Sequence, residues 1–188
     1  MRAWPDAFSL GAIAVDPSKG KDARRGDYSA IVFVGLSGAN IFVDSSISRR
    51  PVEQIINDGI DMAETYASSL HGFGVEVNAF QELLVGEFER QVEARQLNPL
   101  PIHTMTNSVN KKLRIGRLGP YFARRKFIFR PTPSNRLLVD QCKTFSMAET
   151  SGVHDDGPDG LEMAVRLLNH LAGIEVADDG LGFTDFLV

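Results

Sequence analysis

The sequence predicts one α/β domain with a mixed sheet flanked by helices, its elements following the order β-β-β-α-β-α-β. Two observations support this prediction. Three short apolar segments near the N-terminus are separated by turn-forming residues and no helix, which indicates an antiparallel meander. Segments with helical spacing then alternate with short apolar strands, which is typical of an α/β fold. The chain has 188 residues, 43% of them hydrophobic, enough for one such domain with a full core.

The segment Gly11–Asp16 is the first predicted strand and the centre of the predicted sheet. Ala12 to Val15 form an unbroken apolar run, which favours a central strand buried on both faces. Asp16 follows where the strand leaves the core, and Pro17 comes next. A carboxylate in that position is costly to bury unless a positive group satisfies it, so we expect a metal ion or a helix N-terminus beside it.

The remaining elements are predicted from turn residues and periodicity. Tyr28–Leu36 and Ala39–Asp44 are rich in β-branched and aromatic residues and flank the turn signal Ser37-Gly38, which completes the meander. Proline suits the first turn of a helix, and Asn or Ser suits a cap. The later elements are a helix from Pro51 to about Leu70, a strand over Phe73–Val77, a helix capped by Asn78 from about Ala79 to Arg95, a strand over Pro99–Thr104, a helical segment capped by Asn107 or Ser108 through Leu118, an extended segment Lys126–Arg130, a helix over Ser134–Thr144 and a final helix from Asp156 to about Leu171.

The domain is expected to span residues 11–171, with an N-terminal tail or linker stub over 1–10 and a C-terminal tail over 172–188. No apolar run reaches 18 residues and the N-terminus lacks the apolar core of a signal peptide, so we expect a soluble, non-exported protein without a membrane partner. Cys142 is the single cysteine, and no histidine motif adjoins it, so packing is favoured over a nucleophilic role.

Charge is distributed unevenly although the net charge is only −4. From Ala94 to Val139 there is no Asp or Glu, yet the segment holds half of the 20 basic residues. A basic surface that faces a polyanion is one interpretation, and a solvated basic face without a ligand is the alternative. The basic residues are Arg95, Lys111, Lys112, Arg114, Arg117, Arg124, Arg125, Lys126, Arg130 and Arg136.

Further acids accompany Asp16. Glu76 interrupts a buried strand and would need a counter-charge there, unless it lies on the exposed face. Asp155, Asp156 and Asp159 fall at the start of the last helix, where acids can also simply cap the helix. Three acids beside His154 exceed what a cap requires, so a site is favoured. Hard oxygen ligands suit Mg²⁺ or Mn²⁺, and two such ions about 3.5–4 Å apart can hydrolyse a phosphodiester.

These residues resemble the nuclease domain of the large terminase subunit of tailed bacteriophages, which has a ribonuclease H-like fold. The matching pieces extend over about residues 11–170 in the family's order. They are Ala14-Val15-Asp16-Pro17 with Gly26-Asp27-Tyr28-Ser29-Ala30, then Val75-Glu76-Val77-Asn78, then Lys111-Lys112-Leu113-Arg114-Ile115, and His154-Asp155-Asp156 with Asp159. The resemblance implies a metal-dependent endonuclease that cuts double-stranded viral DNA during genome packaging.

The resemblance also implies roles for individual residues. Asp16 and Glu76 would be catalytic metal ligands, with the third acid taken from the late cluster: Asp156 is favoured, with Asp159 and Asp155 behind it. Asp27 and His154 would contact the metal ligands, and not the metal ions themselves, and would hold the ligands in place. Two ions of Mg²⁺ or Mn²⁺ are expected. The phosphate backbone would be contacted by basic residues, namely Lys111, Lys112, Arg114, Arg117, Arg124 and Arg125.

The expected partners by resemblance are double-stranded DNA, a packaging ATPase domain, a small terminase subunit and a portal, in the cytoplasm of a bacterial host. No Gly-x-x-x-x-Gly-Lys-Ser/Thr loop occurs, so the chain should not translocate DNA by itself. We therefore expect an excised domain or a separately encoded nuclease. Two alternatives stay open: a Holliday-junction resolvase or transposase-like nuclease of the same fold, and a non-catalytic nucleic-acid-binding module.

Overall fold

The computed structural model describes residues 3–17, 28–77, 82–97, 100–145, 154–174 and 183–186. The strands are β1 (Leu10–Asp16), β2 (Ser29–Ser37), β3 (Asn40–Ser48), β4 (Gly72–Glu76), β5 (Ile102–Met105), β6 (Phe127–Phe129) and β7 (Phe183–Phe186). The helices are α1 (Val52–Thr65), the 3₁₀ turn η1 (Ala67–Ser69), α2 (Glu82–Ala94), α3 (Lys111–Gly116), α4 (Gly119–Ala123), α5 (Pro133–Thr144) and α6 (Asp156–Leu171). The predicted element order is confirmed over the described residues.

All of these strands belong to one seven-stranded mixed sheet in the order β6-β3-β2-β1-β4-β5-β7. β1 is its middle strand, antiparallel to β2 and parallel to β4, and β2 is antiparallel to β3. The side chains of Ala12 to Val15 are fully buried. The predicted fold class, the meander and the central position of the first strand are therefore all confirmed.

The register of the central strands sets the position of two acids. Val15 of β1 is paired with Val75 of β4, and the two strands are parallel. Asp16 and Glu76 come one residue later on each strand, so both lie at the same edge of the sheet. The meander predicted for β2 and β3 places Ala30 opposite Asp16 on the other side.

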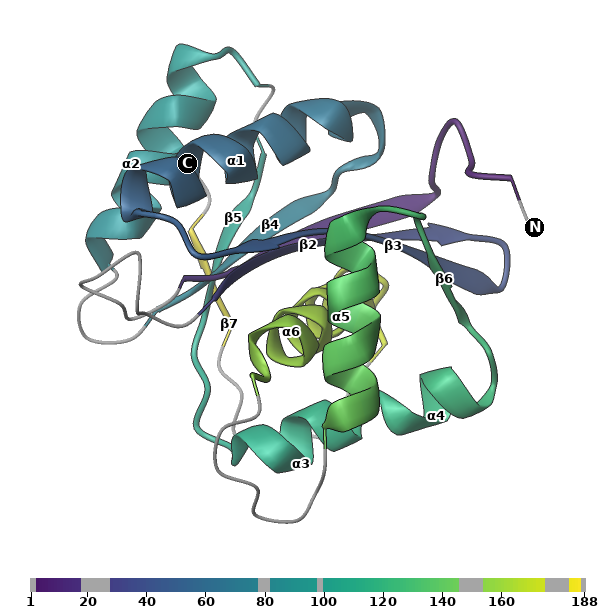
Figure 1. The fold of residues 1–188 in the computed structure, drawn as a ribbon. Helices are drawn as coiled ribbons and strands as arrows, with labels where there is room; N and C mark the ends of the chain where they lie inside the picture. The colour runs from purple at the N-terminus through teal and green to yellow at the C-terminus, as the bar shows by residue number, and fades with distance from the viewer. Residues whose placement is uncertain are drawn as a thin grey trace.

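Helices cover both faces of the sheet, with α1 and α2 on one face and α5 and α6 on the other (Figure 1). α6 packs over β1 and β2, and its residues 157–168 are buried around the whole helix. Gly160 makes close packing possible, because a Cβ atom there would lie 3.0 Å from the Cβ of Ala30. The core therefore brings the first turns of α6 to the edge where β1 ends.

The segment between β5 and β6 differs from the prediction in two ways. Asn110, rather than Asn107 or Ser108, caps α3, and its side chain accepts a hydrogen bond from the backbone N–H of Lys112 at 2.9 Å. The predicted helix also ends early and a second short helix, α4, follows with Pro120 in its first turn. The side chain of Asn107 does not cap the helix because it forms hydrogen bonds with Glu76 and Arg166.

Both predicted tails contain ordered structure. Leu10 begins β1, and Phe8 is a core residue whose ring packs edge-on against Phe33. Phe183–Phe186 form β7, which pairs antiparallel with β5 at the end of the sheet. Four residues carry too short a pattern for sequence periodicity to mark a strand. The predicted cap Asn78 lies outside the described residues. None of the described helices is long and apolar enough to cross a membrane.

Candidate active site

Three carboxylates from separate elements come together at the edge of the sheet where β1 ends. Asp16 is only 8% exposed and Asp159, from α6, is 3% exposed. Burial raises the pKa of Asp16 well above its ordinary value, and the nearby charges of Glu76 and Asp159 raise it further. A hydrogen bond from Asp16 to Glu76 acts in the same direction. The charged form of Asp16 is therefore disfavoured in this site, first by burial and then by the neighbouring acids.

The acids at the start of α6 do not serve mainly as helix caps. Asp155 occupies the N-cap position, but its side chain makes no capping hydrogen bond. Gln141 of α5 caps the helix in part instead, because its Oε1 accepts a hydrogen bond from the backbone N–H of Gly157 at 2.9 Å. Asp155 pairs with the ammonium of Lys111 at 2.7 Å. The charge of Asp159 acts on Asp16, and Asp156 lies half-buried in the first turn of the helix.

Lys111 pairs with two of these acids. Its ammonium lies 2.7 Å from Asp155 and 3.3 Å from Asp159. Burial by itself lowers the pKa of Lys111, but the negative charges of Asp159, Asp155 and Asp16 outweigh burial and raise it. Lys111 thus remains an ammonium at any working pH and neutralises part of the carboxylate charge.

Arg114 lies inside the protein, which differs from the predicted contact with phosphate. Its side chain is 3% exposed, and its Nη1 lies 2.7 Å from Asp159 and 3.0 Å from Glu162. A guanidinium held by two buried carboxylates compensates their charge. Of the other predicted DNA contacts, Lys112 and Arg117 are half-buried, and Arg124 and Arg125 are exposed at the end of α4.

Two further predicted residues are placed differently. His154 is exposed and its ring packs edge-on against Tyr28, with 5.0 Å between the ring centroids. The guanidinium of Arg49 lies over the same Tyr28 ring. No contact between His154 and the carboxylates is seen among the described residues, so this contact stays a prediction. Asp27 lies outside the described residues.

Sequence reasoning missed a set of polar residues behind the carboxylates, of which Glu162 and Arg166 are buried and Asn107 is half-buried. Asn107 donates through Nδ2 to Glu76 at 2.7 Å and accepts from Arg166 at 2.8 Å. Arg166 in turn pairs with Glu162 one helical turn earlier, at 3.4 Å. Glu162 and Arg166 are four residues apart within the apolar middle of α6, and this spacing is a signal that could have revealed the ion pair.

The donor set fits a hard divalent cation. Burial and the charges of Glu76 and Asp159 disfavour the charged form of Asp16, as its raised pKa indicates. A divalent cation beside these carboxylates would favour their charged forms. Among the described residues no group of three or more His, Cys, Asp or Glu is spaced to hold a metal ion.

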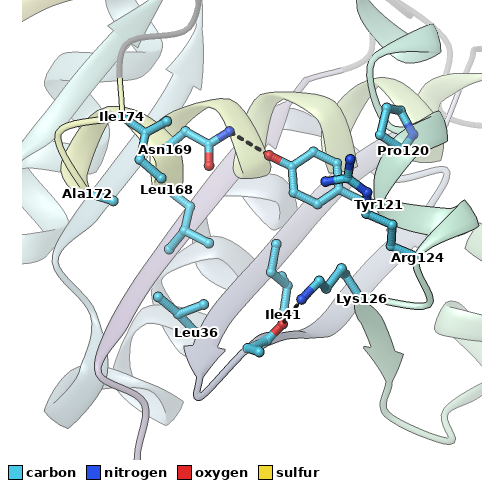
Figure 2. A pocket seen from close by; sticks show the side chains of 11 residues that line it. Leu36, Ile41, Pro120, Tyr121, Arg124, Lys126, Leu168, Asn169, Ala172 and Ile174 are labelled. Carbon is cyan, nitrogen blue, oxygen red and sulfur yellow. Dashed lines mark hydrogen bonds between the residues drawn. The ribbon is translucent and has the colours of Figure 1, made fainter.

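An apolar cavity of about 360 Å³ lies at the opposite end of the sheet (Figure 2). Leu36 and Ile41 from the β2–β3 hairpin line it, together with Tyr121 and the C-terminal turns of α6. Asn169 donates to the hydroxyl of Tyr121 at 3.0 Å within this lining. The cavity is thus separate from the carboxylates, which lie at the N-terminal end of α6. Cys142 is half-buried, and burial raises the pKa of its thiol to about 12, in agreement with a packing role.

The meander continued by parallel strands, the helices on both faces and the acids at the end of the middle strand define a ribonuclease H-like fold. Solved structures of this fold are similar to the chain. The large terminase nuclease of the thermophilic phage G20c aligns with a TM-score of 0.53 and 14% identity, over 84% of this chain and 81% of that one. The yeast mitochondrial Holliday junction resolvase Ydc2 aligns with a TM-score of 0.52 and 12% identity, over 90% and 82%.

The large terminase of the thermophilic bacteriophage D6E is also similar, with a TM-score of 0.54 and 10% identity. The alignment covers 90% of this chain but spans only 41% of that protein. No protein-family model matches the sequence, and no curated protein matches it. At these identities the similarity shows the fold, and the ribonuclease H-like nuclease fold predicted from the sequence is confirmed.

Proposed function

We propose that this protein is a metal-dependent endonuclease that cuts double-stranded viral DNA during genome packaging. The observation that supports the proposal most is the meeting of Asp16, Glu76 and Asp159 at the end of the middle strand, with burial and mutual repulsion raising the pKa of Asp16. Clustered carboxylates in a fold shared with terminase nucleases suit two ions of Mg²⁺ or Mn²⁺.

The chain's own residues would act as follows. Bound divalent ions would supply an activated water and stabilise the leaving oxygen of the phosphodiester. Asp16, Glu76 and Asp159 would hold them through their carboxylate oxygens. Lys111 would balance the charge of Asp155 and Asp159 and stand beside the phosphate that is cut.

The third ligand is proposed to be Asp159, with Asp156 and Asp155 as alternatives. Asp159 is buried and its charge acts on Asp16, while Asp155 is paired with Lys111. Asp156 is a half-buried first-turn residue of α6 and remains an alternative ligand.

Asp159→Asn is therefore expected to reduce metal-dependent cleavage by about 10²-fold, whereas Asp156→Asn, a matched change on the same helix, should reduce it by less than ~10-fold. Initial rates of plasmid cleavage across a Mn²⁺ series would measure both. Equal losses in the two variants would assign a role in metal binding to Asp156 as well, and a larger loss in Asp156→Asn would reverse the assignment.

The proposed DNA surface uses Lys111, Lys112, Arg117, Arg124 and Arg125 for the phosphate backbone. Arg114 is proposed to support the site from inside instead, since Asp159 and Glu162 already hold its guanidinium. A packaging ATPase domain, a small terminase subunit and a portal are the proposed protein partners, in the cytoplasm of a bacterial host, because two of the similar structures are large terminase proteins.

Plasmid cleavage by the purified chain in EDTA, Mg²⁺ and Mn²⁺ tests the proposal. We expect nicking or linearisation only with a divalent metal. Asp61→Asn is a suitable control, because Asp61 is an exposed acid on α1 that pairs with Arg95. It should cut like the wild type. Cleavage in EDTA would contradict a metal mechanism, and DNA binding without cleavage under any metal would favour the non-catalytic binding module.

A second candidate function is a Holliday-junction resolvase or a transposase-like nuclease. The yeast resolvase aligns over 82% of its own length, as fully as the phage nuclease does. Comparing linear duplex with four-way junction DNA separates the two functions. Preferential cutting of the junction would support the resolvase, and equal or faster cutting of plain duplex would support the packaging nuclease.

A further inference from the structure

A continuous series of buried and half-buried side chains joins two of the carboxylates behind the site. Glu76 ends β4 and Asp159 lies on α6, and the path between them passes through both charged and neutral groups. The links are Asn107 to Glu76 at 2.7 Å, Arg166 to Asn107 at 2.8 Å, Arg166 to Glu162 at 3.4 Å, Arg114 to Glu162 at 3.0 Å and Arg114 to Asp159 at 2.7 Å. Asp16 interacts electrostatically with both Glu76 and Asp159, and we call Asp16 and the linked residues together the polar ring.

Asn107 is the one neutral member of this ring, and its chemistry suits its place. Glu76 offers only acceptors when ionised, and the Arg166 guanidinium offers only donors. A side-chain amide satisfies both at once, with the nitrogen turned to Glu76 and the oxygen to Arg166. An acid would repel Glu76 and a base would repel Arg166, whereas the amide adds no charge.

The charged members of the ring are held firmly. Arg114, Glu162 and Arg166 are each 5% exposed or less. Buried and mutually paired charges lose much interaction energy if one of them moves, so each keeps its partner in place. Asn107 lies on the loop between β5 and α3, and its bond to Arg166 ties that loop to α6.

We propose that Asn107 is a positioning residue: it holds the carboxylate of Glu76 at a fixed place relative to Asp159, through Arg166, and so sets the affinity of the site for a divalent cation. The inference rests on the proposed function, since it assigns Glu76 and Asp159 to metal binding. Replacing a residue that hydrogen-bonds to a metal ligand and orients it typically changes the affinity of the protein for the metal by about 10–100-fold.

Calorimetric titration of the full chain with Mn²⁺, in the absence of DNA, tests the inference. Asn107→Gln keeps the amide but moves it by one methylene, and Asn107→Leu removes it. We expect Mn²⁺ to bind at least ~10-fold more weakly to both variants than to the wild type. Asn169→Leu is the matched control, because Asn169 is a half-buried amide bonded to Tyr121 at the other end of α6. Its Mn²⁺ affinity should equal that of the wild type.

Thermal unfolding of the metal-free variants separates positioning from a purely structural role. If Asn107→Gln keeps the wild-type midpoint and still binds Mn²⁺ more weakly, the positioning role is supported. If wild type and both Asn107 variants bind Mn²⁺ equally, the inference is overturned while the proposed function stands. If the wild type itself binds no Mn²⁺, the proposed metal-dependent nuclease and the inference are both overturned.

Discussion

Asp16→Asn is expected to abolish metal-dependent cleavage and also to raise the thermal stability of the metal-free protein. Burial, Glu76 and Asp159 together raise the pKa of Asp16 in the folded state. A raised folded pKa means that the contribution of Asp16 to stability is complete below its unfolded pKa and is lost as the pH rises through the folded value. At neutral pH the buried Asp16 carboxyl therefore costs stability, and Asn removes the titrating group while keeping the shape.

Thermal unfolding in EDTA at pH 7 should show a midpoint about 2–4 °C higher for Asp16→Asn, which corresponds to ~1 kcal/mol in a domain of this size. The difference should shrink as the pH is lowered toward 4, where the wild-type carboxyl is protonated. Cleavage should fall by at least ~10²-fold. Asp61→Asn should change neither quantity. A mutant that is less stable than the wild type at pH 7 would contradict the proposed electrostatic cost at this site.

Arg114→Met is expected to destabilise the protein by about 3–5 kcal/mol. The substitution keeps the buried volume similar but leaves Asp159 and Glu162 without the guanidinium that both of them contact. Burial already raises the pKa of Glu162. Without Arg114 both acids would sit in a low-dielectric interior with less compensation, so the folded state should lose stability most at neutral and higher pH.

Urea unfolding at pH 7 measures the effect of Arg114→Met, and Arg124→Met serves as the control because Arg124 is exposed. The control should change stability by less than ~0.5 kcal/mol. If Arg124 contacts phosphate, its loss should also flatten the salt dependence of DNA binding by about one unit. Wild-type stability in Arg114→Met, combined with a flattened salt slope, would instead restore the phosphate contact predicted from sequence.

Much of the backbone could be predicted because it depends on local patterns. The apolar run before Asp16 predicts a fully buried middle strand, and the structure has one. The final helix begins at Asp156 and ends at Leu171, as its periodicity predicts. The acids at the ends of β1 and β4 and at the start of α6 are visible in the sequence too, since each interrupts or borders an apolar segment.

Only the tertiary structure decided which partners those side chains meet. Asp156 and Asp159 share a helical face in the sequence, and the close packing of Gly160 on Ala30 accompanies the burial of Asp159 near Asp16. Asn107 is separated by 31 residues from Glu76 and by 59 from Arg166. Sequence periodicity reports which positions are buried. The partner of a buried polar group depends on strand register and helix packing across the whole chain.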